Sequence, residues 1–500
     1  MRFAFTSRCS AMSRSAHFSR LKTAKSFSNK SKLAGQPSQE LLLDVVRLDD
    51  EGNGIAKAPI GGLNQTTDIK IPFSLPGERC LVNYVEGSDS AELVELVRHS
   101  QQRQEPPCEH FAHCGGCQLQ HMTYSRQLEF KRDRMWAGLQ GLLNLKSQAT
   151  KSKVKPKLGK KPASKASIPS VIQTRLKCRE DISLLSCDPF EYRRRARLGI
   201  SKGGQLGFRR ANSNDTISLG NCLNLSSNLQ QVMQSLNEFF IRHKDVPWSK
   251  HVGHVELLDV APSPLILMRL VMPVADKVFA ELNDLIAARN WRLAVQSEKS
   301  GNYTPHQGLL NSYYPLHGLD IVFEPGKFIQ INDSLNQAMV SQALSWLTLE
   351  GTERLLDLFC GTGNFSLTFA QHAGQVLGVE LSPEMVAIAA QNAADLGIEN
   401  VEFVAANLDA GESFLRAHEK LAQAKPDIVV LDPPRAGAAG FIPTLLELSP
   451  QRILYISCHQ GSFLRDLRKL GGASYRLEKL SVMDMFPNTE HVECMALLSR

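Results

Sequence analysis

The stretch Asp357-Leu358-Phe359-Cys360-Gly361-Thr362-Gly363-Asn364 decides the fold class of this chain. The apolar run at 354–359 predicts a buried strand, and a helix is expected over 364–371. Two glycines in the turn between them let a bound molecule approach the backbone closely. A glycine-rich turn between a buried strand and a helix is typical of the first repeat of an open α/β sheet.

Strands and helices continue to alternate after this turn. Apolar runs predict further strands at 375–380, 401–404, 427–431 and 452–456. The helix after the first of these ends at Gly397 and has an apolar face made of Met385, Ile388, Ala389, Ala393 and Leu396. The alternation predicts a doubly wound parallel sheet, in which ligands bind at the carboxyl ends of the strands.

The turn discriminates between nucleotide ligands. After Gly361 and Gly363, the third glycine of a dinucleotide-binding turn is absent, because Ser366 stands in its place. Glu380 ends the second strand about twenty residues later, where a carboxylate can bind both ribose hydroxyls. A ligand with an adenosine and no pyrophosphate suits this pair. We therefore expect S-adenosylmethionine rather than NAD.

Two more strand ends carry reactive side chains. The segment Asp432-Pro433-Pro434-Arg435 follows the fourth strand. Its two prolines make the backbone after the carboxylate rigid, which suits the binding of a planar base. Cys458 follows the next strand, where a thiolate can be a nucleophile, especially beside a cation that lowers its pKa. The segment 484–494 adds carboxylates and a histidine. The structural alternatives are a proline-stiffened loop and a small buried cysteine.

A second group of cysteines has the spacing of metal ligands. Five residues separate Cys108 from Cys114, and two glycines separate Cys114 from Cys117. Candidates for a fourth ligand are Cys178, Cys187 and Cys222. The spacing leaves zinc and a [4Fe–4S] cluster both open. Eleven cysteines and no secretory segment favour a reducing compartment.

Two regions before the α/β part favour contact with nucleic acid. Alternating residues at 41–46 and 79–85, with turn clusters between them, predict a small OB-like β-barrel. Arginines beside aromatic residues at 191–197 and 206–210 can bind phosphates and stack on bases. The alternative for these arginines is a strand edge that charge protects from aggregation.

Positive charge is concentrated in two segments. Residues 1–39 contribute +8 and residues 134–179 contribute +12 to a formal charge of +7, which leaves −13 for the rest of the chain. Both segments have the composition of disordered chains. They are either passive tails or flexible arms for a phosphate backbone, and the first also has the composition of a transit peptide. No apolar run is long enough to span a membrane.

Together these motifs resemble those of the bacterial RNA uracil-5 methyltransferases, and among them most closely the 23S ribosomal RNA enzymes. The resemblance covers roughly residues 40–500 apart from a Lys-rich insert at 146–170. Its most specific parts are Cys-Gly-Gly-Cys-Gln at 114–118, Tyr-Arg-Arg-Arg-Ala-Arg at 192–197, Phe-Ile-Gln-Ile-Asn at 328–332, the turn at 357–364, Leu-Asp-Pro-Pro-Arg-Ala-Gly-Ala at 431–438 and Asp-Met-Phe-Pro at 484–487.

The resemblance implies a multidomain α/β protein. Its parts would be a basic tail at 1–39, an OB-like TRAM β-barrel at 40–100, an iron–sulfur central domain at 101–325 and a Rossmann-like class I methyltransferase domain at 326–500. The implied [4Fe–4S] ligands are Cys108, Cys114, Cys117 and Cys222. The implied S-adenosylmethionine contacts are Gln330, Phe359, Gly361, Gly363, Asn364, Glu380, Asn407 and Asp432.

The family chemistry implies methylation of uracil carbon 5 in 23S ribosomal RNA, at the equivalent of uracil 1939. Cys458 is expected to add to carbon 6, and the resulting enolate takes the methyl group. Glu493 then removes the proton from carbon 5 and Cys458 is expelled. The target base must leave its stack to react. We expect a cytoplasmic monomer that binds 23S ribosomal RNA and no membrane.

Two positions depart from the family pattern. His459-Gln460 follows the nucleophile where Asn-Pro is usual, and Leu223 follows Cys222 where proline is usual. One alternative is a sister enzyme that modifies another ribosomal uracil or a tRNA uracil. The expected barrel and cluster argue against the tRNA enzyme. A second alternative, which His459 favours, is a catalytically impaired RNA-binding protein.

Overall fold

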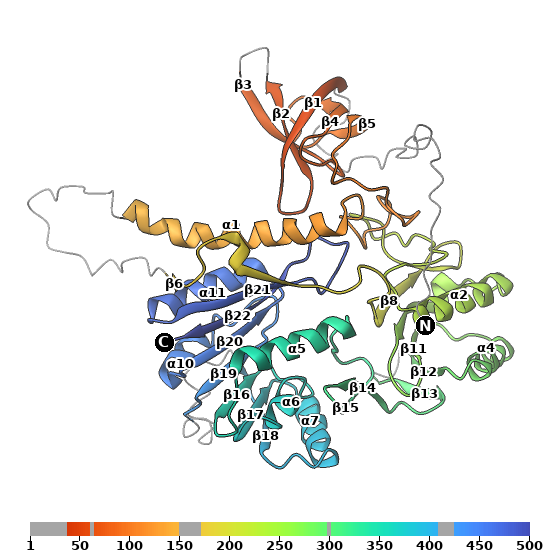
Figure 1. Cartoon of the computed structure of the whole chain (residues 1–500). Helices are drawn as coiled ribbons and strands as arrows, with labels where there is room; N and C mark the ends of the chain where they lie inside the picture. Colours follow the sequence, from red (N-terminus) through yellow and green to blue (C-terminus); the bar gives the residue numbers. More distant parts are fainter. Residues whose placement is uncertain (1–37, 61–64, 150–171, 298–301, 409–424) are drawn as a thin grey trace, which may run out of the picture. The chain divides into compact units, whose positions relative to one another are not determined.

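The computed structural model describes residues 38–60, 65–149, 172–297, 302–408 and 425–500. The chain divides into two compact units, residues 1–103 and 104–500, and each is described by itself (Figure 1). Most of the basic tail and of the Lys-rich insert lies outside the described residues. Their proposed roles as arms therefore stay predictions.

The first unit is an antiparallel sheet of five strands in the order β3-β2-β1-β4-β5. The strands are β1 (Ser38–Leu48), β2 (Gly54–Ile60), β3 (Gln65–Ile71), β4 (Arg79–Val85) and β5 (Glu92–Arg98). The Lys70 amide donates to the Asp89 carbonyl at 2.9 Å, and the Lys70 carbonyl accepts from Ala91 at 2.8 Å. These bonds join β3 to the residues before β5, so the sheet curls toward closure.

The alternation expected at 79–85 is present in β4. Cys80, Val82 and Tyr84 are buried and the residues between them are not. Side chains that alternate in this way fill one face of a curled sheet, and here they pack against Val45 of β1. The turn clusters expected at 50–54 and 75–78 separate β1 from β2 and β3 from β4.

A large mixed sheet carries the C-terminal half of the second unit, in the order β18-β17-β16-β19-β20-β22-β21-β6. Its parallel strands are β16 (Arg354–Leu358), β17 (Gln375–Glu380), β18 (Val401–Ala405), β19 (Ile428–Leu431) and β20 (Arg452–Ser457). All five were expected from the sequence. Their central strands are buried, which explains their continuous apolar runs.

The sheet is not purely parallel, which the sequence reading missed. β22 (Glu493–Ser499) runs antiparallel to both β20 and β21 (Arg476–Met483). β21 also pairs with β6 (Gln173–Thr174) and β7 (Ile182–Leu185), from much earlier in the chain. An antiparallel strand begins where its parallel neighbours end. The loop 484–492 and the start of β22 therefore lie at the carboxyl edge of the sheet.

Helices cover both faces of this sheet. They are α1 (Tyr124–Ala149), α5 (Asp333–Leu347), α6 (Ser366–Ala370), α7 (Pro383–Asp395), α10 (Ile442–Leu448) and α11 (Gln460–Gly472). α7 begins with Ser382 as N-cap and a proline at the first position, and it buries Ala389 and Ala393 on the predicted face. α1 lies beside α11 (Figure 1) and adds Met135 and Leu139 to the core.

The intervening residues form a six-stranded sheet in the order β13-β12-β11-β10-β8-β9 and a hairpin. The strands are β8 (Arg195–Ile200), β9 (Leu206–Gly207), β10 (Val252–Leu258), β11 (Leu265–Leu270), β12 (Arg292–Ser297) and β13 (Thr304–Gln307), followed by the hairpin β14 (Ser312–Leu316) and β15 (Leu319–Phe323). The helices α2 (Ser227–Arg242), α3 (Trp248–His251) and α4 (Asp276–Ala288) share one apolar core with this sheet.

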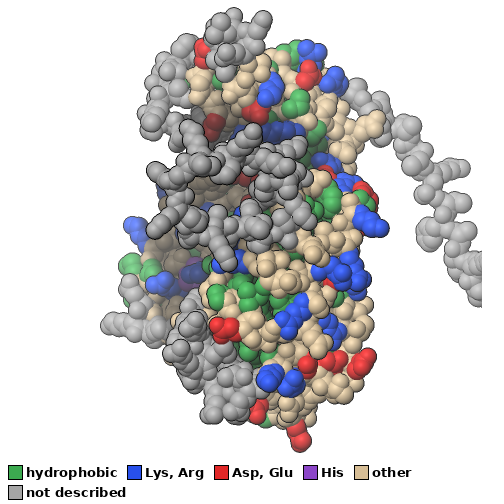
Figure 2. Space-filling view, turned by 90° about the vertical axis from the view of Figure 1, so that its left-hand side faces the viewer, with side chains coloured by type: hydrophobic (Ala, Val, Ile, Leu, Met, Phe, Trp, Pro, Cys, Tyr) green, Lys and Arg blue, Asp and Glu red, His purple; other side chains and the backbone are tan. Residues whose placement is uncertain are grey.

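The surface drawn in Figure 2 has basic and acidic side chains interspersed, with hydrophobic side chains between them. Among the described residues, none of the helices combines the length and apolar character needed to cross a membrane.

Candidate active site

Cys458, Glu493 and Asp432 meet at the carboxyl edge of the large sheet. Cys458 directly follows β20, Asp432 follows β19 and Glu493 begins β22. Ser457 pairs with Cys494 across the antiparallel strands, so Cys458 lies opposite Glu493. The three side chains are close enough for their charges to affect one another. The structure thus places side by side three residues that the sequence singled out.

The Cys458 thiol is in an environment that disfavours the thiolate. Burial, followed by the Glu493 and Asp432 carboxylates, raises its pKa to about 11, while Arg435 acts in the opposite direction. Arg435 is a cation of the kind that lowers a thiol pKa, but burial and the two carboxylates outweigh it here. A group that accepts the thiol proton is therefore needed when the sulfur reacts.

Glu493 and Asp432 are suited to exchange protons near neutral pH. Burial raises the pKa of Glu493 to about 8, and Asp432 and Asp484 raise it too, whereas Lys131 lowers it. Burial also raises the pKa of Asp432 to about 7. A carboxyl group whose pKa lies close to the working pH can both accept and return a proton. Perturbed carboxyls in such a cluster are typical of catalytic sites.

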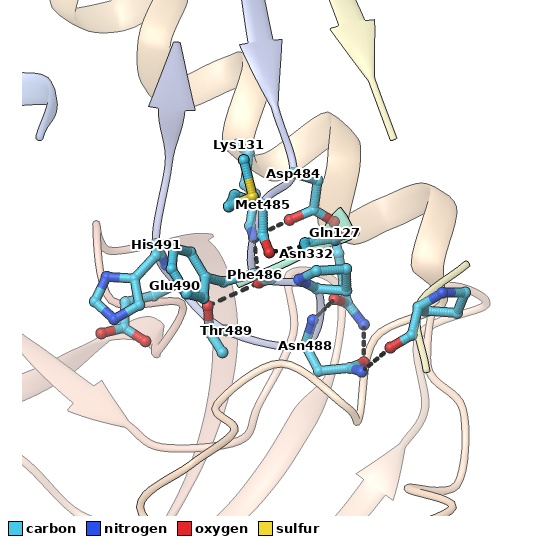
Figure 3. A network of polar contacts seen from close by, with 12 residues as sticks. Gln127, Lys131, Asn332, Asp484, Met485, Phe486, Asn488, Thr489, Glu490 and His491 are labelled. Carbon is cyan, nitrogen blue, oxygen red and sulfur yellow. Dashed lines mark hydrogen bonds and ion pairs between the residues drawn. The ribbon is translucent and has the colours of Figure 1, made fainter. Parts of the chain in front are cut away.

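The loop 484–492, which carries Glu493 at its end, is held to helix α1 (Figure 3). Lys131 Nζ lies 2.5 Å from Asp484 Oδ1, and both side chains are fully buried. The same ammonium donates to the Phe486 carbonyl at 3.1 Å, and Arg134 Nη1 donates to the Glu490 carbonyl at 2.6 Å. A buried ion pair with further hydrogen bonds fixes geometry well, because breaking it leaves an unpaired charge.

Sequence reasoning missed the role of helix α1, although a signal existed. Gln127 and Lys131 precede Met135 and Leu139 at intervals of four, so all four lie on one face of the helix. Met135 and Leu139 are buried in the core. Polar side chains on a buried stripe require polar partners, and here the loop 484–492 provides them.

The glycine-rich turn has the geometry of a ligand-binding turn. Phe359 has a φ of 66° and Gly363 a φ of 97°, in the left-handed region. The Glu380 carboxylate accepts from the Gly361 amide at 3.2 Å and from the Ser382 amide at 3.2 Å. The carboxylate therefore fixes the turn and faces the edge at which the strands end.

The other expected cofactor contacts lie on neighbouring segments. Asn407 is exposed just after β18, and Gln330 precedes α5, where its carbonyl accepts from Arg194 Nε at 2.8 Å. The Asn364 amide is already bonded, with Oδ1 at 3.2 Å from the Tyr314 hydroxyl and 3.0 Å from Asn336 Nδ2. Asn364 thus fastens the turn to its neighbours, a role that the sequence did not indicate.

The four cysteines expected to bind the cluster lie in one region. The charge of Cys222 affects the pKa values of Cys114 and Cys117, and that of Cys108 affects Cys114 and Cys222. Burial is the first cause that raises all four pKa values. Cys117 Sγ accepts from Asn224 Nδ2 at 3.1 Å and Cys114 Sγ from the Gly116 amide at 3.4 Å.

The other two candidates for the fourth ligand lie elsewhere. Cys187 accepts from Asn332 Nδ2 at 3.0 Å, and Cys178 is exposed beside Asp181. Among the residues that the structure describes, no three His, Cys, Asp or Glu side chains are placed to hold a metal ion. The thiols of Cys108, Cys114, Cys117 and Cys222 are gathered but not closed around a single-ion site.

His459, the main departure from the family pattern, caps helix α11. Its Nδ1 accepts from the Ser462 amide at 3.1 Å. Asparagine is a common N-cap and proline is favoured at the next position, so Asn-Pro would begin the helix in the same way. Gln460 at that position donates to the Arg134 carbonyl at 2.7 Å. His459-Gln460 thus fits the role of a helix start.

The arginine-rich segment divides into internal and exposed side chains. Arg194 is buried, pairs with Asp333 at 2.5 Å and lies over the Tyr314 ring. Arg195 pairs with Glu256. Arg197 is exposed. Of the arginines at 191–197, the buried and paired ones hold the protein together, so the prediction of RNA contact stays a prediction for the exposed arginines alone.

Comparison with known proteins identifies relatives over almost the whole chain. A family model described as tRNA (Uracil-5-)-methyltransferase matches residues 179–500. A 23S rRNA (uracil(1939)-C(5))-methyltransferase RlmD of Shewanella amazonensis is 36% identical over 95% of this chain and 99% of its own. The same-named protein of Aliivibrio fischeri is 34% identical over 92% of this chain and 96% of its own.

A solved structure shares the fold. The Pyrococcus abyssi tRNA (uracil-54, C5)-methyltransferase in complex with S-adenosyl-L-homocysteine superimposes with a TM-score of 0.63 at 21% identity, over 92% of this chain and 100% of its own. This likeness covers the whole of that chain and shows that the two proteins share their fold.

Proposed function

Because this chain belongs to the family of RNA uracil-5 methyltransferases, we propose that it methylates carbon 5 of a uracil in 23S ribosomal RNA, at the position equivalent to uracil 1939. The observation that carries the proposal is the 36% identity with a relative of that name over 95% of the chain. The convergence of Cys458, Glu493 and Asp432 supports it independently, because carbon 5 methylation needs a nucleophile and a base.

The proposed reaction uses Cys458 as nucleophile and Glu493 as base. The Cys458 sulfur forms a bond to uracil carbon 6 as its proton passes to a neighbouring carboxylate, and carbon 5 becomes an enolate carbon. S-adenosylmethionine supplies the methyl group to that carbon when bound. Glu493 then removes the carbon 5 proton. The double bond between carbons 5 and 6 re-forms as the bond between carbon 6 and the Cys458 sulfur breaks, and the released thiolate regains its proton from the neighbouring carboxyl group.

The residues proposed to hold S-adenosylmethionine follow successive strands of the sheet. Phe359, Glu380, Asn407 and Asp432 come after or end β16, β17, β18 and β19. The glycines of the turn, Asn364 and Gln330 complete the set. Carboxyl ends of parallel strands are the usual ligand edge of such sheets, which supports the assignment.

We also propose that Cys108, Cys114, Cys117 and Cys222 hold a [4Fe–4S] cluster. In such a cluster each thiolate binds a different iron, so the ligands lie further apart than around one ion. The four thiols lie in one region and two of them accept hydrogen bonds from N–H groups, which supports the proposal. The surrounding residues would form the central domain at 101–325, which a TRAM domain at 40–100 precedes in the sequence.

The cluster proposal predicts that anaerobically purified protein is brown and contains about four irons per chain. Cys114→Ala should lose the colour and most of the iron, because it removes one ligand. The exposed Cys178 provides the matched control, and Cys178→Ala should keep both. Stoichiometric zinc without iron in the anaerobic protein would contradict the proposal.

The function is tested by mapping methylated uracils in ribosomal RNA from cells with and without the gene. We expect one 23S site, equivalent to uracil 1939, to lose its methyl group completely and to regain it with the purified protein. Loss of methylation at another ribosomal uracil or at a tRNA uracil would reject this target and leave the chemistry standing. The expectations of a cytoplasmic location and of a monomer stay predictions.

A further inference from the structure

Asn488 joins the loop 484–492 to the cysteine region. Its side chain is buried, with 1% of its surface exposed, and its φ of 68° is left-handed. The Asn488 carbonyl accepts from the backbone amides of Gln118 and Leu119, both at 3.0 Å. These two residues directly follow Cys117. The turn that carries a proposed cluster ligand is thus bonded to the middle of the loop.

A second connection runs through side chains. Asn488 Nδ2 lies 3.2 Å from Asn224 Oδ1, and Asn224 Nδ2 donates to Cys117 Sγ at 3.1 Å. Asn488 Nδ2 also donates to the Pro189 carbonyl at 2.7 Å. Asn224 lies two residues after Cys222, so each connection begins beside a proposed ligand.

A third set of bonds fixes Asn488 to helix α1 (Figure 3). The Asn488 amide donates to Gln127 Oε1 at 2.9 Å, and Gln127 Nε2 donates to Asn488 Oδ1 at 3.2 Å. Every polar group of Asn488 therefore has a partner, and the partners come from separate segments. A left-handed, fully bonded, buried asparagine costs backbone strain, which its surroundings must compensate.

We infer that Asn488 is a positioning residue that ties the loop bearing Glu493 to the cysteine region, so that the state of the cysteines affects the placement of the general base. The loop 484–492 has Asn488 at its centre and Glu493 at its end. Loss of the bonds at Cys117 frees the centre of the loop, and Glu493 then reaches carbon 5 less often. The inference rests on the proposed roles of Glu493 and the cysteines.

The test replaces Asn488 by glycine, which tolerates the same φ and removes only the side chain. We expect turnover to fall by about 10- to 100-fold, since small misplacements of catalytic groups have such effects. Because the elimination step needs Glu493, a larger fraction of the enzyme should be caught as a denaturant-stable RNA adduct. Iron content and the KM for S-adenosylmethionine should stay unchanged. Asn290→Gly, at an exposed left-handed position of φ 54°, is the matched control.

Hydrogen exchange provides a readout that does not depend on activity. In Asn488→Gly and in Asn224→Ala, amides at 484–493 should exchange faster while iron is retained. Removal of iron from the wild-type protein should speed the same amides. In Asn488→Gly it should add less, because the side-chain connection through Asn224 is gone while the backbone bonds to Gln118 and Leu119 stay. If iron removal alters exchange at 108–119 and leaves 484–493 unchanged, the coupling does not exist. If Asn488→Gly lowers turnover without adduct, Asn488 has only a structural role.

A second variant covers the case in which Asn488→Gly does not fold, and the exchange experiment separates this inference from the proposed function. Should the variant unfold, Asn224→Ala keeps Asn488 with its bonds to Gln127 and Pro189 and removes only the side-chain connection to Cys117. It should show the same adduct and exchange changes to a smaller degree. A wild-type protein that methylates no RNA rejects the proposed function, while the exchange experiment still decides whether the loop and the cysteines are coupled.

Discussion

Cys458→Ala is expected to abolish methylation, with turnover reduced by about 10³-fold or more, since a covalent route without its nucleophile has no substitute. Binding of S-adenosylmethionine should survive, because the proposed cofactor contacts are Gln330 before α5 and residues at or after the ends of β16 to β19, and Cys458 is not one of them. The measurement compares methyl transfer to 23S ribosomal RNA with cofactor affinity by calorimetry. Activity that stays within a few-fold of wild type would rule out the covalent route through Cys458.

The chain offers a matched control for this substitution. Cys494 pairs across the strands with Ser457, next to Cys458, and its side chain is buried with 1% exposed. Cys494→Ala removes a neighbouring sulfur and leaves the proposed nucleophile in place. It should cost some stability through the small cavity and keep most of the activity. Equal loss in both variants would indicate disruption of the sheet edge rather than loss of a nucleophile.

The parallel strands could be read from the sequence because each is a continuous apolar run bounded by a turn. β17 was expected at 375–380 and lies at Gln375–Glu380. The antiparallel β22 was not recognised, because its apolar residues look the same in either direction. The direction of a strand depends on the loop that connects it to the strand before it. The loop 484–492 before β22 is held by contacts with α1, whose residues are more than 350 positions away in the sequence.

In the candidate site too, features set by local sequence could be predicted, and features set by distant contacts could not. Cys458 and Asp432 were identified because strand ends share an edge, which is a local rule. The direction of the pKa shift of Cys458 could not be predicted, because the carboxylate opposite it is placed there by strand pairing. Asn488 gave no local signal at all, since its partners Gln118, Gln127 and Asn224 come from three separate segments. Residues that position a site are thus harder to read than residues that react.

Glu493→Gln is expected to stall the reaction after methyl transfer and to accumulate a covalent protein–RNA adduct. The Cys458 sulfur can still add and the methyl group can still be transferred, but the proton on carbon 5 stays. Loss of a general base slows such a step by about 100-fold or more, so the adduct should survive denaturant and be seen by electrophoresis. Wild-type enzyme should give a similar adduct on RNA with 5-fluorouridine at the target, because fluorine does not leave as a proton does.

The two adducts, that of Glu493→Gln and that of the wild type on 5-fluorouridine, should differ in their pH dependence. In the wild-type protein, Glu493 has a pKa of about 8 and its carboxylate raises the pKa of Cys458. Above pH 8 the negative charge of Glu493 opposes formation of the Cys458 thiolate, whereas glutamine carries no charge. Adduct formation by Glu493→Gln should therefore begin at a lower pH than adduct formation by the wild type on RNA with 5-fluorouridine. Glu490→Gln, in the same loop, is the control and should turn over without adduct. A trapped peptide that carries its nucleotide on Cys360 or Cys494 would reject Cys458 as the nucleophile, because only the attacking sulfur keeps the bond to carbon 6.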